Sequence, residues 1–215
     1  NLDLIWKYKS NDSIGKDIQA NPVVNNGLIY TSTPGNNVVC LDGKTGKEIW
    51  RYKVKEGLAA RRGLLIWKKS SDKIPRIFFT NNRDKVIALN ANTGKKIKSF
   101  GNNGEIEIGV SPIPPLIIDN YLIVSSLKPD LQVYNVQNGD LLWKYYLKEP
   151  KNSLLFENFL KGNPWGGISA DHIRGIVYLT TGNPHPEYIG VDRPGNNLYA
   201  NSIIAIDIRN KKKLW

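Results

Sequence analysis

The chain repeats a short pattern of apolar and turn-forming positions. In each copy a short apolar run ends in Asp or Asn, a turn follows, and an aromatic residue closes the unit. The four copies run from Val38 to Trp50, from Val86 to Phe100, from Leu131 to Trp143 and from Ile203 to Trp215. A period of this size predicts a repeat fold, in which each unit buries its apolar faces against its neighbours.

Each unit contains two hairpins. The first is a strand, a short turn and a second strand, with turns at Asn25-Asn26-Gly27, Asp119-Asn120 and Arg174-Gly175. The second hairpin has its turn at Lys44–Lys47, Asn92–Lys95 or Gln137–Asp140, each with a glycine, and at Arg209–Lys212, which has none. About four strands per unit is the content of one β-propeller blade. The sequence therefore predicts an all-β fold, a β-propeller with four-stranded blades.

A tryptophan marks the end of most units. The equivalent positions are Trp6, Trp50, Trp143 and Trp215, which we expect to wedge between blades as tryptophan-docking residues. One unit has Lys98 at that position, with Phe100 close by, and the last unit is long enough to carry an insertion. Within that insertion, residues Ser153–Lys161 have the composition of a short helix.

The whole chain is predicted to be one domain, a partial propeller over residues 1–215. Its repeat units end near Trp6, Trp50, Phe100, Trp143 and Trp215, and they amount to about four blades, or half of a larger ring. The sequence contains no Met, so we expect it to be a piece of a longer protein. A half-ring alone would leave blade faces and strand edges uncovered.

Composition narrows the possible partners. The formal net charge is +11, and the basic residues are scattered through turns without an aromatic-interleaved stripe, which argues against nucleic acid. A positive field favours an anionic ligand or an acidic partner protein. The single cysteine, Cys40, excludes an internal disulfide and is expected to be a buried apolar residue. No apolar run reaches membrane-spanning length, so any anchor is expected outside this chain.

Several motifs interrupt the repeats. They are Gly162-Asn163-Pro164-Trp165-Gly166-Gly167, Thr181-Gly182-Asn183-Pro184, Asp192-Arg193-Pro194-Gly195-Asn196 and Arg61-Arg62-Gly63 through Trp67. In this order and spacing they resemble the quinoprotein dehydrogenases, which oxidise alcohols and sugars with pyrroloquinoline quinone (PQQ). The resemblance covers the chain from Trp6 to Trp215. It implies an eight-bladed propeller with PQQ and Ca²⁺ on its axis, of which this chain is the N-terminal half.

The resemblance implies four PQQ-binding residues. Trp165 matches the tryptophan on which the flat quinone lies, and its glycine neighbours are expected to leave the ring uncovered. Arg62 matches the arginine at the polar edge of the quinone, where a guanidinium suits a tricarboxylate. Gln19 stands where the family often has Glu, and it still hydrogen-bonds a carboxylate. Ser111 lies near a hydroxyl contact of the family.

The resemblance also implies two metal ligands and leaves the catalytic base unassigned. Asn183 matches the asparagine that gives its side-chain oxygen to Ca²⁺, and Asp130 falls where the family has an acidic ligand, in a shortened loop. The family's aspartate base lies in a segment that would follow Trp215. Neither His172 nor His185 is assigned a role.

The resemblance predicts a periplasmic enzyme that oxidises an alcohol or aldose and passes electrons to ubiquinone or a cytochrome. A second reading is a non-catalytic, protein-binding propeller, like the barrel-assembly lipoprotein of the outer membrane. A third interpretation is a family member that has lost its site, which Gln19 and the short loop at Asp130 favour. The segment that would follow Trp215 would distinguish these interpretations, since the enzyme is expected to carry its aspartate base there.

Overall fold

The computed structural model describes residues 3–12, 19–69, 71, 74–127, 130–147, 164–184, 189–191, 197 and 199–215. Within these ranges the regular secondary structure consists of β-strands, which form four antiparallel sheets of four strands each. The prediction of an all-β fold with four-stranded blades is confirmed. The short helix expected at Ser153–Lys161 lies outside the described residues.

Each sheet is one blade, and its strands follow one another in chain order from the inner to the outer edge. Blade 1 consists of β1 (Val23–Asn25), β2 (Leu28–Thr33), β3 (Asn37–Asp42) and β4 (Glu48–Lys53). Blade 2 consists of β5 (Leu65–Trp67), β6 (Arg76–Thr80), β7 (Lys85–Asn90) and β8 (Glu105–Glu107). Blade 3 consists of β9 (Leu116–Ile118), β10 (Tyr121–Ser126), β11 (Asp130–Asn135) and β12 (Leu141–Tyr146). Blade 4 consists of β13 (Ile168–Asp171), β14 (Ile176–Thr180), β15 (Ile203–Asp207) and β16 (Lys212–Lys213).

The inner hairpins form where the sequence places its turn residues. Asn25 pairs with Leu28, so Asn26 and Gly27 alone connect β1 to β2. Both residues have positive φ, 49° and 75°, which is the type I′ turn that follows the right-handed twist of the strands. In blade 3 the two-residue connection Asp119-Asn120 likewise begins with a positive φ, of 53°.

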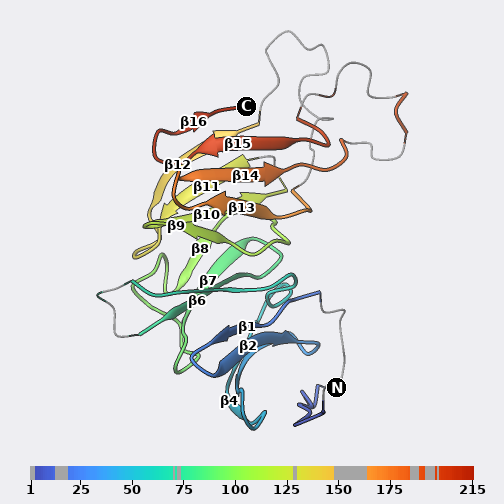
Figure 1. The fold of residues 1–215 in the computed structure, drawn as a ribbon, viewed down its shortest axis with the longest axis vertical. Helices are drawn as coiled ribbons and strands as arrows, with labels where there is room; N and C mark the ends of the chain where they lie inside the picture. Colours follow the sequence, from blue (N-terminus) through green and yellow to red (C-terminus); the bar gives the residue numbers. More distant parts are fainter. Residues whose placement is uncertain are drawn as a thin grey trace.

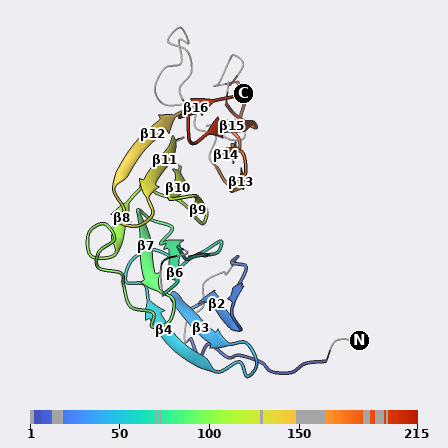
Figure 2. The ribbon, with the colours of Figure 1, turned by 60° about the vertical axis from the view of Figure 1, so that its left-hand side comes forward.

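The four blades lie side by side along an arc (Figures 1 and 2). Neighbouring blades enclose three apolar cores, one between each pair. Because side chains alternate across a strand, Phe79 of β6 packs toward blade 1 while Phe78 packs toward blade 3. Cys40 is fully buried in the first of these cores, as expected.

Tryptophans connect one unit to the next. The indole Nε1 of Trp6 donates to the carbonyl of Gly43 (3.0 Å), and that of Trp50 donates to the carbonyl of Ala91 (2.8 Å). Each ring lies on the glycine of the next outer hairpin turn: a Cβ on Gly94 would stand 2.6 Å from the Trp50 ring. The predicted docking of Trp6 and Trp50 between units is therefore present in the structure.

Two of the later interfaces depart from this pattern. In blade 2, Phe100 precedes the outer strand β8 instead of lying within it, because residues after Lys96 leave the sheet and return at Glu105. The indole Nε1 of Trp143 in β12 is buried without a hydrogen-bond partner. In the turn that should receive it, Lys211 replaces the usual glycine and holds a left-handed φ of 56°.

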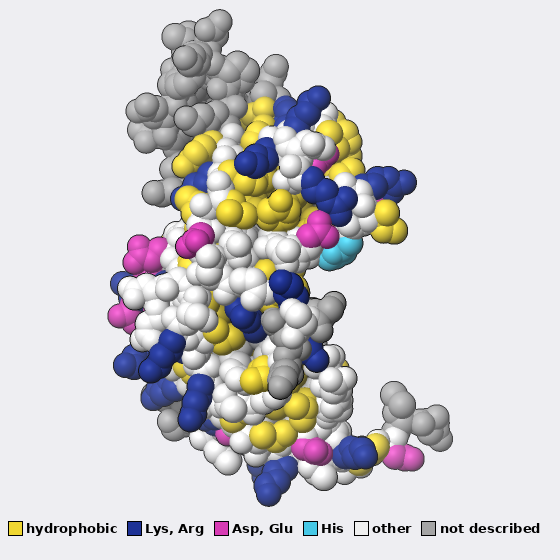
Figure 3. Space-filling model, turned by 90° about the vertical axis from the view of Figure 1, so that its left-hand side faces the viewer, with side chains coloured by type: hydrophobic (Ala, Val, Ile, Leu, Met, Phe, Trp, Pro, Cys, Tyr) yellow, Lys and Arg dark blue, Asp and Glu magenta, His cyan; other side chains and the backbone are white. Residues whose placement is uncertain are grey.

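Charged side chains are distributed broadly over the surface. Lys and Arg lie among Asp and Glu over much of the face in Figure 3, without a single basic stripe. Among the described residues no helix is long and apolar enough to cross a membrane.

Candidate functional site

All six residues predicted for the site lie at one end of the propeller. Successive strands of a blade run in opposite directions, so the connection between blades and the turn from second to third strand share an end, here named the crossover end. Gln19, Arg62, Ser111 and Trp165 lie in the segments that lead into inner strands, Asp130 begins β11, and Asn183 follows β14. The blade topology therefore places residues that are distant in sequence at a common end.

A tight turn presents Arg62. The N–H of Gly63 donates to the carbonyl of Ala60 (2.9 Å), so Arg61 and Arg62 form the middle of the turn. Ala60 is fully buried with a φ of 44°, and its N–H donates to Thr80 at the end of β6 (3.1 Å). Anchoring at Ala60 fixes the backbone of the turn that carries the Arg62 side chain.

A side chain that sequence reasoning missed, Asn36, holds the segment before this turn. Its amide nitrogen donates to the carbonyls of Val54 (3.3 Å) and Gly57 (2.9 Å), and its oxygen accepts from the N–H of Ala59 (2.5 Å). Asn36 itself has a φ of 69°, a region that Asn tolerates better than most residues. Its place in the Gly35-Asn36 turn was the available sequence signal, but that signal does not reveal its partners.

The structure brings Arg62 and Trp165 together. The guanidinium carbon of Arg62 lies 5.1 Å from the centre of the Trp165 ring, and the side chain donates a hydrogen bond to the Trp165 carbonyl. The contact joins the connection between blades 1 and 2 to the segment that enters blade 4. The guanidinium Nε is buried without a partner, which leaves a donor for a bound acceptor.

The glycines beside Trp165 have separate structural reasons. A Cβ on Gly166 would stand 2.5 Å from the Thr180 hydroxyl, so the chain passes too close to β14 for any side chain. Gly167 has a φ of +91° with open space around it. Close packing behind the chain and a left-handed turn leave the indole 39 % exposed, as an accessible aromatic surface.

Gln19 and Ser111 lie at the crossover end in different settings. The N–H of Gln19 donates to the carbonyl of Arg61 (3.2 Å), so the segment before β1 runs beside the Arg62 turn. Ser111 is 1 % exposed, and its hydroxyl lies 3.5 Å from the carbonyl of Ile113, which also accepts from Thr80 (3.2 Å). Gln19 adjoins the Arg62–Trp165 pair, whereas Ser111 is held within its own loop.

The two predicted metal ligands have opposite environments. Asp130 is 4 % exposed, and its carboxylate accepts from the N–H and hydroxyl of Ser126 (3.2 and 2.9 Å) and from the amide of Gln132 (2.9 Å). Tyr134 donates to the oxygen of that Gln132 amide (2.6 Å), and burial together with the Asp130 charge raises the pKa of Tyr134 to about 12. Asn183, by contrast, is exposed.

These residues fit the quinone more closely than they fit a metal. An accessible indole and a guanidinium with an unused buried donor suit a flat, anionic aromatic ligand. The carboxylate of Asp130 already accepts three hydrogen bonds, and no group of three or more His, Cys, Asp or Glu side chains among the described residues is arranged to hold a metal. The metal-ligand roles of Asn183 and Asp130 therefore remain predictions.

The blades form a β-propeller in which tryptophans dock one unit onto the next. The Arg62–Trp165 pair at its crossover end is a candidate site for a flat anionic ligand. A family model described as the PQQ-type glucose/ethanol/alcohol dehydrogenase β-propeller domain matches residues 1–215. The chain belongs to this family.

One curated relative supports this assignment, and two solved structures share the fold. Quinohemoprotein alcohol dehydrogenase ADH IIB of Pseudomonas putida is 27 % identical over 250 residues, which cover 100 % of this chain and 35 % of the relative. A europium-containing methanol dehydrogenase has the same fold, with a TM-score of 0.74, 19 % identity, and coverage of 99 % of this chain and 43 % of that protein. BamB from Moraxella catarrhalis shares the fold with a TM-score of 0.60, 12 % identity, and coverage of 98 % and 52 %. The chain spans about a third of the length of the first curated relatives it matches.

Proposed function

We propose that the protein at its full natural length is a PQQ-dependent dehydrogenase that oxidises an alcohol or an aldose. The electrons pass to ubiquinone or a cytochrome, and the protein works in the periplasm, with any membrane anchor outside this chain. The observation that carries the proposal is the Arg62–Trp165 pair, in which a half-exposed indole lies beside a guanidinium with an unused buried donor. Family membership over residues 1–215 supports the same activity.

The chain's own residues bind and orient the cofactor. The Trp165 ring would support the flat quinone, and the guanidinium of Arg62, which lies over the indole, would pair with its carboxylates. Gln19, beside the Arg62 turn, would contribute a further polar contact, whereas the buried Ser111 would have to become accessible to contribute one. When bound, the quinone supplies the two-electron oxidation of the substrate's CH–OH group.

The proposal includes Ca²⁺ as the metal, with Asn183 and Asp130 as ligands from this chain. The exposed amide oxygen of Asn183 is a suitable donor for a hard cation. Asp130 would exchange hydrogen bonds from Ser126 and Gln132 for the metal. Because one structural neighbour is a europium-containing enzyme, metal identity is tested directly by adding Ca²⁺ or a lanthanide to the metal-free protein.

Turnover is the test of this function. The full-length protein is reconstituted with PQQ and Ca²⁺ and assayed by dye reduction against a panel of alcohols and aldoses, with Trp165→Ala beside it. We expect turnover that requires PQQ and is lost in the variant, and the active substrates define the class. PQQ binding without turnover would indicate a family member that has lost its chemistry. Neither binding nor turnover would favour the alternative hypothesis of a non-catalytic, protein-binding propeller.

A further inference from the structure

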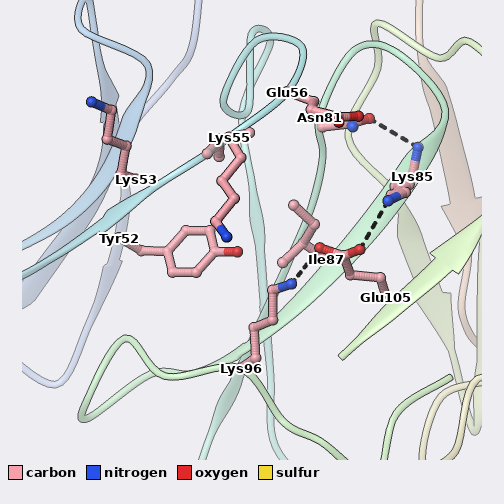
Figure 4. Close-up of a pocket in the computed structure, with 10 residues that line it drawn as sticks. Tyr52, Lys53, Lys55, Glu56, Asn81, Lys85, Ile87, Lys96 and Glu105 are labelled. Atoms are coloured by element: carbon pink, nitrogen blue, oxygen red, sulfur yellow. Dashed lines mark hydrogen bonds and ion pairs between the residues drawn. The ribbon is translucent and has the colours of Figure 1, made fainter. Parts of the chain in front are cut away.

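A cavity of about 370 Å³ lies between blades 1 and 2, away from the Arg62–Trp165 pair. It is lined by the end of β4 and the residues after it, by the start of β7, and by Lys96 and Glu105 (Figure 4). The cavity exists because the outer strand of blade 2 is interrupted. Lys96 bridges to β7, the chain leaves the sheet, and only Glu105–Glu107 return to pair with it.

The cavity carries unbalanced positive charge. Glu105 accepts from both Lys85 (3.1 Å) and Lys96 (2.5 Å), so one carboxylate serves two ammonium groups. The Lys55 ammonium also points into the cavity, toward the hydroxyl of Tyr52 (Figure 4). The other carboxylate in the lining, Glu56, forms an ion pair with Arg83 (3.4 Å). The lining contains four lysines (Lys53, Lys55, Lys85 and Lys96) and two glutamates (Glu56 and Glu105), a formal excess of two positive charges.

The equivalent place one unit earlier is neutralised. Tyr8 and Tyr52 each follow a docking tryptophan by two residues, and Glu48 stands at the turn position that Lys96 occupies in blade 2. There Tyr8 donates to Glu48 (2.5 Å), and Arg51 pairs with both Glu48 (2.7 Å) and Asp12 (3.2 Å). Two carboxylates around one guanidinium leave no excess of positive charge there, unlike in the cavity between blades 1 and 2.

We propose that the lysine cavity, formed by Lys55, Lys85, Lys96 and Tyr52, binds a tetrahedral oxyanion of the phosphate class. An ammonium group has three N–H donors. Lys85 and Lys96 each use one of them on Glu105, and Lys96 uses another on the Tyr52 hydroxyl. The remaining donors and the Tyr52 hydroxyl converge from separate elements, as the several acceptor oxygens of a phosphate require. A dianion would also balance the charge excess.

Calorimetric titration of the full-length protein with inorganic phosphate at constant ionic strength tests the proposal. We expect saturable binding that weakens about tenfold to hundredfold in Lys55→Gln, since a charge-assisted hydrogen bond is lost. Lys55 is exposed and its loss should not disturb folding. Lys44→Gln removes the same charge from an exposed turn and should leave the affinity unchanged. Glu105→Gln should bind phosphate several-fold more tightly, because the competing carboxylate is gone.

Either of two results would overturn the proposal: no saturable binding, or equal weakening in Lys44→Gln and Lys55→Gln, which would indicate general charge screening. A phosphate monoester of a lipid headgroup offers the same chemistry as free phosphate. Sedimentation with phosphatidic acid vesicles separates these sources. Vesicle binding that depends on Lys55 assigns the site to lipid, and phosphate binding without vesicle binding assigns it to a soluble phosphate.

Discussion

Arg62 and Trp165 form the centre of the candidate site, and each depends on residues that fix its backbone. Gly166 allows the Trp165 segment to pass against Thr180, and Ala60 and Gly63 close the turn that presents Arg62. Asn36 contributes from a greater distance, because its one side chain satisfies three backbone groups of the segment before that turn. Close glycine packing, backbone hydrogen bonds across the turn and the side-chain hydrogen bonds of Asn36 therefore position the pair together.

Replacing Asn36 tests this positioning. We expect Asn36→Ala to lower the free energy of unfolding by about 2–4 kcal/mol, because three hydrogen bonds are lost and alanine is strained at positive φ. Asn36→Gly keeps the backbone conformation and should lose about 1 kcal/mol less. Urea unfolding of both variants gives the comparison. Equal stability of Asn36→Ala and the unmodified protein would show that the side-chain hydrogen bonds of Asn36 do not stabilise the fold.

At the element scale, the blades depend on a repeated contact between a tryptophan and a glycine turn. Trp6 and Trp50 have both parts of this contact, the ring on the glycine and the indole hydrogen bond. Trp143 has a buried indole nitrogen without a partner, opposite a turn in which Lys211 adopts a left-handed conformation. The interface between blades 3 and 4 therefore lacks the indole hydrogen bond that Trp6 and Trp50 make.

Lys211→Gly should stabilise this interface by about 0.5–1 kcal/mol. The gain comes from relieving the left-handed strain of lysine, less the greater freedom of glycine in the unfolded chain. The reverse change, Gly94→Lys, should cost at least about 2 kcal/mol, because its Cβ would stand 2.6 Å from the Trp50 ring. Chemical denaturation of the two variants measures both effects. A loss of stability in Lys211→Gly would contradict the explanation.

At the scale of the whole molecule, the sequence predicted the architecture better than the site. Apolar runs, turns such as Asn26-Gly27 and the spaced tryptophans are local signals, and they sufficed for four-stranded blades. The excursion before β8 was not anticipated, because Phe100 resembles a unit end in sequence. Arg62 and Trp165 were singled out by resemblance to a family, since their contact depends on the placement of separate blades. The lysine cavity was likewise not predicted, because its lining residues come from separate segments of the chain.

Buried tyrosines between the blades make the whole molecule sensitive to alkali. Burial raises the pKa of Tyr30, and burial with the Asp130 charge raises that of Tyr134, from 10.0 to about 12. Because the unfolded chain ionises first, stability should be full below pH 10.0 and should fall as pH rises toward about 12. Urea unfolding across this range should show a shallower decline in Tyr134→Phe. An unchanged slope would contradict the assignment.

Retention of the cofactor by the protein tests whether Arg62 and Trp165 form a quinone site. The full-length protein, Trp165→Ala and Trp67→Ala are loaded with PQQ, passed through gel filtration and measured for bound quinone. Trp67 is the matched control, because it also pairs with an arginine, Arg76 at 5.9 Å, but ends β5 at the opposite end of its blade. We predict retention in the unmodified protein and in Trp67→Ala, and loss in Trp165→Ala. Equal retention in both variants, or none in the unmodified protein, would contradict the account.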